Sequence, residues 1–286
     1  MARSDRLFRL LTALRMLPQP VTAARLAEET EVSERTIYRD IETLRAGGAL
    51  IDGAAGVGYS LTEIDSRLWY SGFIEYLKEN PMITLFHAPQ SRSSRIMTLI
   101  DEMGIQDQVR IVPVNILRQD GTGGADPQNP HPDAKAPALV HDATLITESA
   151  AAILYLTDLF PESGMAPKQG DAKRGEYLTW LFYYGGVVEP VLLCEAMGIK
   201  HPALTRTFRD HAEIAARLRS ALSKGPWLLG ETYTAADLLM HSPYGWFKDA
   251  TPGDPLIRDW VARCLARPAR ARTAATDAML MGQLTA

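Results

Sequence analysis

The sequence predicts a multidomain chain: a small head of helices and one hairpin, then an α/β domain, then an all-helical domain. Three observations support this. The chain has 286 residues, which exceeds the usual size of a single hydrophobic core. Its first 64 residues combine short helical stripes with a glycine-rich hairpin, and residues 82–163 alternate strands and helices. From about residue 170 onward the apolar spacing is helical almost throughout.

Composition limits the classes of function. Hydrophobic residues make up 46% of the chain, enough for folded cores, and the net charge is −4. Cys194 and Cys264 belong to no metal-binding or redox spacing, and the histidines are scattered, so we expect no metal. We expect a cytoplasmic protein that does not enter a membrane, because no apolar run approaches about 18 residues and no signal sequence is recognisable.

The head begins with three predicted helices. Leucines in the first helix recur at the spacing of one helical face, and prolines end it. Thr22 can cap a short second helix, and Ser33 can cap a third helix over residues 34–46. The leucines of the first helix are Leu7, Leu10, Leu11 and Leu14.

Two short strands around Gly53, Gly56 and Gly58 predict a hairpin after the third helix, which completes a winged helix-turn-helix. The head has eight basic and nine acidic residues, so any DNA contact must come from charges on one face. The polar face of the third helix is the candidate, and a merely solvated helix face is the alternative. Its predicted DNA-binding residues are Ser33, Arg35, Thr36, Tyr38 and Arg39.

Residues 32–45 (VSERTIYRDIETLR), with the wing ending GYSL, resemble the head of bacterial regulators that carry a WYL ligand domain, and more loosely the DeoR-type regulators. The resemblance covers about the first 60 residues. It implies that the third helix enters the major groove of double-stranded DNA. The sensor domain usual in those regulators is absent here.

Residues 65–81 are predicted to form a linker helix. The segment is apolar and aromatic, whereas a flexible linker would be rich in Gly and Ser. We therefore expect it to pack on the body or on a second subunit. A plain connector helix that covers its own core is an equal alternative.

Four ordered motifs follow in the body: HAPQSRSSR from His87, NPHPDAKAPAL from Asn129, TES from Thr147, and WLLGE with TAAD from Trp227. Together they resemble soluble glutathione transferases of proteobacterial type over about 200 residues. The resemblance implies a thioredoxin-like, glutathione-binding domain over residues 82–163, an all-helical domain over 170–280, and a homodimer. Thr234 and Asp237 have the spacing of a capping box and are interpreted as structural only.

Ser91 and Ser93 are the candidate catalytic residues. They lie where a helix begins, and the free amides there favour an anion such as a thiolate. A serine hydroxyl that donates to the sulfur of glutathione would lower the pKa of the thiol. The alternative is that both serines only cap the helix. Some classes use a tyrosine or a cysteine in this region, where the present chain has Phe86 and Arg92, so turnover is in question.

The resemblance implies further site residues. A cis peptide at Ala136-Pro137 would pair with the glutathione backbone, while Glu148 and Ser149 would hold its γ-glutamyl group. His131 and Lys135 could reach its glycine carboxylate. Three aromatic residues of the first long body helix could line an electrophile or effector pocket, or could be ordinary core: Trp180, Tyr183 and Tyr184.

Three functions remain open. The first, which we favour, is a regulator whose body senses glutathione or a glutathione conjugate. The second is an active transferase that conjugates glutathione to electrophiles and carries an appended DNA-binding head. The third is a body that only dimerises and has a dead pocket.

Overall fold

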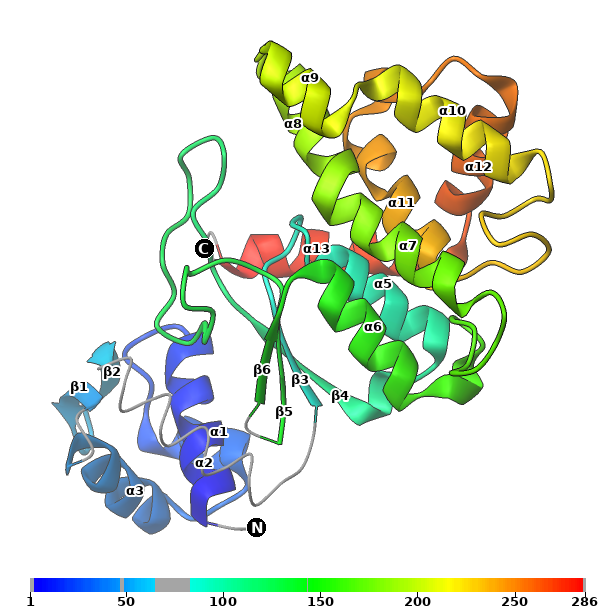
Figure 1. Ribbon diagram of the computed structural model, residues 1–286. Helices are drawn as coiled ribbons and strands as arrows, with labels where there is room; N and C mark the ends of the chain where they lie inside the picture. Colours follow the sequence, from blue (N-terminus) through cyan, green and yellow to red (C-terminus); the bar gives the residue numbers. More distant parts are fainter. Residues whose placement is uncertain (1–2, 47–48, 65–82, 143, 285–286) are drawn as a thin grey trace. The chain divides into compact units, whose positions relative to one another are not determined.

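The computed structural model describes residues 3–46, 49–64, 83–142 and 144–284 (Figure 1). The chain forms two compact units, which we describe separately. The first unit contains residues 1–83, 114–135 and 140–145, and the second contains residues 84–113, 136–139 and 146–286. The predicted linker helix at 65–81 lies outside the described residues, and the predicted domain boundaries stay predictions.

The head has the predicted winged helix-turn-helix fold. Leu10, Leu14, Leu26 and Ile37 are fully buried and bring its helices together. Thr22 caps the second helix through a hydrogen bond from the Arg25 amide, as its sequence predicts. The elements of the head are α1 (Arg3–Met16), α2 (Ala23–Thr30), α3 (Glu34–Ala46), β1 (Ala49–Ala54) and β2 (Gly58–Ile64).

Strands β1 and β2 are antiparallel and form the wing. Gly53 pairs with Tyr59 near the tip and has a φ of +113°, which side chains rarely adopt. A Cβ added to Gly53 would stand 2.0 Å from the carbonyl oxygen of Gly58. Gly53 is therefore required by close backbone approach.

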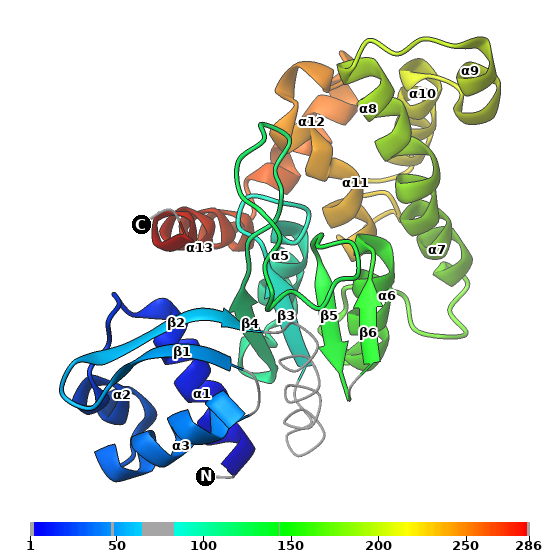
Figure 2. The ribbon, with the colours of Figure 1, turned by 90° about the vertical axis from the view of Figure 1, so that its left-hand side faces the viewer.

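A four-stranded sheet follows, in the order β4-β3-β5-β6 (Figure 2). Every residue of β3 is buried, in agreement with the apolar run predicted there. Helices α5 and α6 pack against each other beside this sheet. The elements are β3 (Ile83–His87), α5 (Ser94–Met103), β4 (Val109–Pro113), β5 (Ala138–His141), β6 (Thr144–Thr147) and α6 (Ser149–Leu159), as expected of a thioredoxin-like domain.

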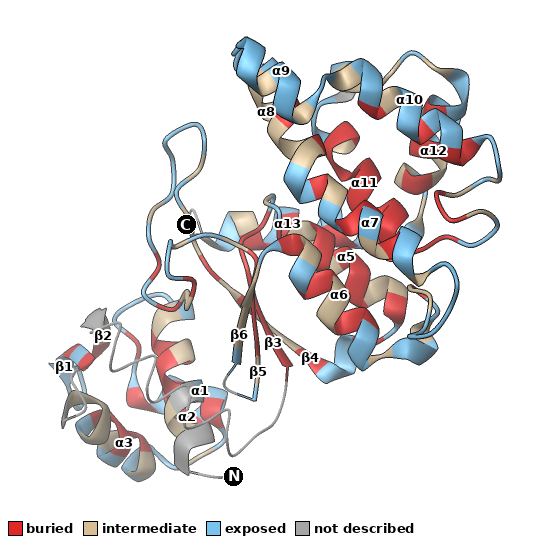
Figure 3. Ribbon diagram, viewed as in Figure 1, coloured by how far each residue is buried: buried red, intermediate tan, exposed pale blue. Residues whose placement is uncertain are grey.

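The rest of the second unit is helical, and its buried residues gather on α11 and on the helices packed around it (Figure 3). Thr234 and Asp237 form the predicted capping box at the start of α11. The helices are α7 (Arg174–Tyr183), α8 (Glu189–Ala196), α9 (Pro202–Phe208), α10 (His211–Leu222), α11 (Ala235–Trp246), α12 (Pro255–Leu265) and α13 (Pro268–Leu284), with a π-helical segment at Tyr184–Val188 between α7 and α8.

One helical stretch corrects an expectation from the sequence. Within the described residues, Arg174–Ala196 is long and apolar enough to cross a membrane by length and composition. We had expected no apolar run of that length. The stretch contains α7, which packs against α11 and α6, and a packed core helix meets the same criteria.

The first unit also includes the long loop at 114–135, so this loop and the head belong to one compact body. Arg15 of α1 forms an ion pair of 2.7 Å with Asp126 of the loop, and the Asp126 side chain is fully buried. Asp126 also accepts hydrogen bonds from the backbone amides of Asn115 and Gln128. The Asp126 carboxylate therefore binds two backbone amides of the loop and links the loop to α1.

Candidate functional site

The turn between β3 and α5 assigns different roles to the two candidate serines. Ser93 has no exposed surface. Its hydroxyl accepts from the Ala88 amide at 3.0 Å, donates toward the Ala88 carbonyl at 2.9 Å, and lies 2.8 Å from Nδ1 of His87. In this structure Ser93 holds the turn together and is fully buried, so its assignment as a catalytic residue stays a prediction.

Ser91 is half-buried and lines a cavity of the second unit. Its hydroxyl donates to the Ala88 carbonyl at 2.7 Å and accepts from the Ser93 amide at 3.2 Å. Donation to a thiol sulfur would require the hydroxyl hydrogen to leave the Ala88 carbonyl. Of the two predicted serines, Ser91 lines the cavity and Ser93 does not. The hydroxyl hydrogen of Ser91 is already used in its bond to the Ala88 carbonyl.

Asp277 of α13 fixes this turn, and the sequence analysis missed it. Its carboxylate lies 2.9 Å from Nε2 of His87 and accepts hydrogen bonds from the Gln90 amide at 2.7 Å and the Ser94 hydroxyl at 2.6 Å. Burial alone would raise the pKa of Asp277, but the hydrogen bonds from His87, Ser94 and Gln90 outweigh it, and the pKa is lowered. A charged carboxylate therefore stands directly behind the serine turn.

A second group of predicted residues lies at β5 and the start of α6. The peptide bond between Ala136 and Pro137 is cis. Glu148 is exposed and has a φ of +67°, while Ser149 is buried in the first turn of α6. Glu148 stands at the N-cap of α6 and makes no side-chain capping hydrogen bond. The free amides of a helix start, with a hydroxyl beside them, can receive a carboxylate.

His131 and Lys135 belong to the first unit, so they are described apart from those residues. His131 is buried, and its Nδ1 accepts a hydrogen bond from the Asp133 amide at 3.1 Å. Lys135 is exposed, with its ammonium 3.8 Å from the Asp133 carboxylate. Their assignment to glutathione stays a prediction.

The three predicted pocket aromatics do not line the cavity that contains Ser91. Trp180 and Tyr184 are buried in the helical core, and Tyr183 lies under the guanidinium of Arg217, 4.0 Å from its ring centre. Burial raises the pKa of the Tyr184 hydroxyl. The alternative of a core cluster therefore describes Trp180 and Tyr184, because their rings fill space between helices.

Cys264 does not have the features of a reactive thiol. Cys264 lines the same cavity but is buried, and burial raises the pKa of its thiol. Arg92, where the resembled class has a cysteine, forms an ion pair with Glu189.

The predicted DNA-binding residues share the outer side of α3. Arg35 and Arg39 are exposed, and within the described residues Arg35 makes no ion pair. The Tyr38 hydroxyl donates to Glu34 at 3.3 Å. Ser33 caps the helix by accepting from the Thr36 amide at 3.3 Å, as predicted. These side chains form one polar helix face.

Arg6 of α1 and Arg45 of α3 itself hold α3 in place. Arg6 of α1 forms a two-point ion pair with Asp40, whose side chain is fully buried. Arg45 donates to the Ile51 carbonyl at 2.9 and 2.7 Å and to the Gly53 carbonyl at 2.8 Å. The inner side of α3 is therefore tied to α1 and to the wing, and Arg35 and Arg39 are exposed on the outer side.

Comparison with known proteins identifies both parts. Residues 6–60 match the HTH domain family, and residues 85–164 match the glutathione S-transferase N-terminal domain family. This chain joins a helix-turn-helix domain to a glutathione S-transferase fold. The prediction from the two sets of motifs is confirmed.

Relatives of known sequence match the two parts separately. Protein LigF of Sphingobium is 29% identical over 49% of this chain and 73% of its own length. The disulfide-bond oxidoreductase YfcG of Escherichia coli is 26% identical over 66% of this chain and 92% of its length. An uncharacterised HTH-type transcriptional regulator of Bacillus subtilis, YobV, is 36% identical over 36% of this chain and 32% of its length.

Solved structures match the transferase fold. A glutathione transferase from Methylococcus capsulatus has a TM-score of 0.54 and 25% identity, over 69% of this chain and 100% of its own. A sphingomonad glutathione S-transferase complexed with glutathione has a TM-score of 0.55 and 21% identity, over 68% of this chain and 99% of its own. The predicted thioredoxin-like and all-helical domains are thereby confirmed as a fold.

Proposed function

We propose that this chain is a DNA-binding transcriptional regulator whose transferase-fold body binds glutathione, or a conjugate of glutathione, as its effector. We also propose a homodimer, which would present two heads to paired half-sites on DNA. The observation that carries the proposal is the polar outer face of α3, held rigid from behind and joined in one chain to a ligand-binding fold. The same arrangement supports a protein that works inside the cytoplasm, where DNA and glutathione meet.

The argument for DNA rests on how α3 is held. The Arg6–Asp40 ion pair and the Arg45 contacts occupy the inner side of the helix, while Arg35 and Arg39 are exposed, with Arg39 only 3.9 Å from Asp40 in a long ion pair. A rigid helix with arginines on its exposed face matches the needs of major-groove recognition. The head carries no excess of basic residues, so its net charge does not attract DNA. Binding would therefore depend on where individual arginines lie.

This part is tested by fluorescence anisotropy on a genomic fragment selected with the full chain. Arg35→Ala and Arg39→Ala should each weaken binding, and loss of one phosphate contact should reduce the salt slope by about 1. Arg219→Ala removes an equally exposed arginine from α10 and should change nothing. Failure to select any specific fragment, or an equal loss in all three variants, would contradict DNA recognition.

The argument for glutathione rests on three groups of the second unit. Ser149 places a hydroxyl at the start of α6, Glu148 beside it is exposed and could pair with an ammonium, and Ser91 lies half-buried in the turn before α5. These groups fit a ligand with a carboxylate, an ammonium and a thiol. Several solved relatives are described as complexes with glutathione, which supports the same ligand here.

The effector role is tested by linkage. If glutathione or S-alkyl glutathione changes the affinity for DNA by some factor, DNA must change the affinity for that ligand by the same factor. Anisotropy titrations with and without ligand, and calorimetry with and without DNA, should therefore give equal ratios different from one. Tight ligand binding with a ratio of one would leave a binding body that regulates nothing.

An active transferase is the second candidate, and the position of Ser91 favours it. In that case Ser91 donates a hydrogen bond to the sulfur and favours the thiolate. Conjugation to an aryl halide should then fall about 10–100-fold in Ser91→Ala, as expected for a hydrogen bond to a charged group of about 1.5–3 kcal/mol. Ser93→Ala should mainly lower stability. A body that binds glutathione without turnover supports the regulator instead.

A further inference from the structure

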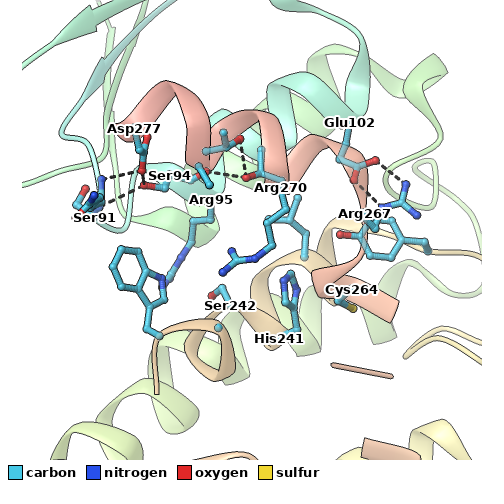
Figure 4. Close-up of a pocket in the computed structure, with 18 residues that line it drawn as sticks. Ser91, Ser94, Arg95, Glu102, His241, Ser242, Cys264, Arg267, Arg270 and Asp277 are labelled. Carbon is cyan, nitrogen blue, oxygen red and sulfur yellow. Dashed lines mark hydrogen bonds and ion pairs between the residues drawn. The ribbon is translucent and has the colours of Figure 1, made fainter. Parts of the chain in front are cut away.

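The cavity lined by Ser91 contains arginine side chains that have no role in the proposed glutathione site. It has a volume of about 230 Å³ and lies in the second unit, between α5, α11 and α13. Arg95 from α5, His241 and Ser242 from α11, and Arg270 from α13 converge in it (Figure 4). Their polar ends face one another across this space, which we call the chamber.

The two carboxylates of this cavity are already committed. Glu102 holds Arg267 through both of its oxygens, at 2.6 and 2.5 Å. Asp277 is occupied by His87, Ser94 and the Gln90 amide. Neither carboxylate is therefore available to neutralise Arg95 or Arg270.

Arg270 carries an uncompensated charge. Within the described residues it forms no ion pair, and burial lowers the pKa of its guanidinium. A Cβ added to Gly245 of α11 would stand 2.5 Å from Nη2 of Arg270. Because Gly245 has no side chain, the guanidinium of Arg270 can lie against α11. Within the described residues no carboxylate pairs with it there.

Arg95 is only partly compensated, since its one ion pair among the described residues is a long one between Nη1 and Glu189. Its side chain is only 8% exposed, and its Nη1 is buried with no hydrogen-bond partner among the described residues. The nearest carboxylate, Glu189, is 3.9 Å away and is already paired with Arg92. The guanidinium rests on the ring of Tyr184, 4.9 Å from its centre. A buried N–H without an acceptor costs free energy that an anionic ligand would recover.

His241 presents a hydrogen-bond acceptor to the same chamber. Its Nδ1 donates to the Asp237 carbonyl at 2.8 Å, so Nδ1 carries the proton of the neutral ring. Nε2 is buried and has no partner among the described residues. Burial, followed by the charges of Arg270, Arg95 and Arg267, lowers the pKa of His241 to about 4. At neutral pH Nε2 is therefore a hydrogen-bond acceptor.

We propose that this chamber binds a small organic acid, whose carboxylate lies between Arg95 and Arg270 and whose neighbouring hydroxyl or amine donates to Nε2 of His241. An inorganic anion without a hydroxyl, such as sulfate, satisfies only half of this arrangement, because all its oxygens are acceptors and would meet the lone pair of Nε2. The site goes beyond the proposed glutathione site, although Ser91 borders both. Its ligand would be a second small molecule beside the thiol.

Calorimetry with the full chain tests the proposal. The probes are 2-hydroxy acids, 2-amino acids, the same acids without the hydroxyl or amine, and inorganic phosphate. A hydroxy or amino acid should bind with a Kd of about 1 mM or tighter, and at least tenfold tighter than its unsubstituted analogue. Absence of any carboxylate binding, or a preference for phosphate over every carboxylate, would overturn the proposal.

Matched variants assign the binding to this chamber. Arg270→Gln should weaken the acid at least tenfold, whereas Arg272→Gln, on the exposed side of the same helix, should leave it unchanged. His241→Phe should remove the preference for the hydroxy acid while keeping carboxylate binding. Should Arg270→Gln fail to fold, Gly245→Ala displaces the guanidinium without removing its charge and should weaken the acid too. Unchanged affinity in the folded variants would place the acid elsewhere.

Glutathione is titrated separately into the same proteins. Ser149→Ala should affect glutathione and spare the organic acid, and Arg270→Gln should do the reverse. If the unmodified chain binds the organic acid but not glutathione, the proposed function is contradicted and the chamber stands. If the unmodified chain binds glutathione but none of the organic acids, the chamber is contradicted and the proposed function stands.

Discussion

Asp277 decides how the serine turn works at the scale of single residues. Its carboxylate contacts His87, Gln90 and Ser94, and His87 in turn contacts Ser93. The hydroxyl of Ser91 lies 3.0 Å from that of Ser93. A chain of hydrogen bonds thus runs from α13 through the turn to the candidate ligand hydroxyl, so α13 is part of the site although it lies far along the sequence.

Asp277→Asn should lower stability by about 1–3 kcal/mol at pH 7, because hydrogen bonds to a charged group are lost. The pKa of Asp277 is lowered in the folded protein, so its stabilisation is present above the unfolded value of about 4 and is lost as the pH falls through the folded value. Urea unfolding from neutral to strongly acidic pH should show a steeper acid loss in the wild type than in the variant.

Asp259→Asn is the matched control, since Asp259 is exposed and pairs only with Arg263 four residues away. It should change stability by a few tenths of a kcal/mol at most. If Asp277→Asn behaved like this control at every pH, the carboxylate would not hold the turn.

The sequence indicated where the site would be but not which serine would serve it. A helix start after a buried strand could be predicted from the pattern around Ser91 and Ser93. The distinction between the two depends on Asp277, which no local pattern connects to them. Arg95 and Arg270 were missed for the same reason, because each resembles an ordinary helix arginine until the chain is folded.

At the scale of elements, Asp237 holds the start of α11 and its neighbourhood. Its carboxylate accepts from the Thr234 amide, the Leu228 amide at 2.9 Å and Nε1 of Trp260 at 3.0 Å. Burial raises the pKa of this carboxyl, and the hydrogen bonds act against that rise. A capping box at one helix end thereby also fixes a loop and α12.

Asp237→Ala should cost about 3–5 kcal/mol, because three buried donors lose their acceptor together. Thr234→Ala removes the cap hydroxyl alone and should cost about 0.5–2 kcal/mol. Chemical denaturation of both variants checks the difference. Equal losses would mean that Asp237 acts as a simple helix cap.

Elements were the scale at which the sequence was most informative. Helix caps such as Thr22, Ser33 and Thr234 act on neighbouring backbone groups, so they can be identified from a few residues. The aromatic run around Trp180 and Tyr184 was ambiguous, since a pocket wall and a core face have the same spacing. Only the packing of other helices distinguishes them.

At the scale of the whole molecule, the ion pair between Arg15 and Asp126 connects a DNA-binding fold with a loop of the transferase fold. Both residues belong to the first compact unit. The loop continues to His131 and Lys135, two residues predicted to meet glutathione. A movement of the loop on ligand binding would therefore act on α1 through the Arg15–Asp126 ion pair. Helix α1 in turn packs against α2 and α3.

Arg15→Ala should lower stability by about 1–3 kcal/mol, because a buried carboxylate loses its cation. Arg25→Ala removes an exposed arginine of the same head and should cost less than about 1 kcal/mol. Thermal unfolding followed by circular dichroism checks both. The double variant Arg15→Ala with Asp126→Asn should recover part of the loss, and the absence of any Arg15 effect would remove this connection.

The position of that ion pair also bears on how such a protein could be divided or recombined. A cut anywhere in residues 65–81 would leave residue 15 on one fragment and residue 126 on the other, so neither fragment would keep its native surface. A chimera that takes its head from one homologue and its body from another would have to carry both positions together. Across evolution, these two positions should therefore change as a pair rather than independently.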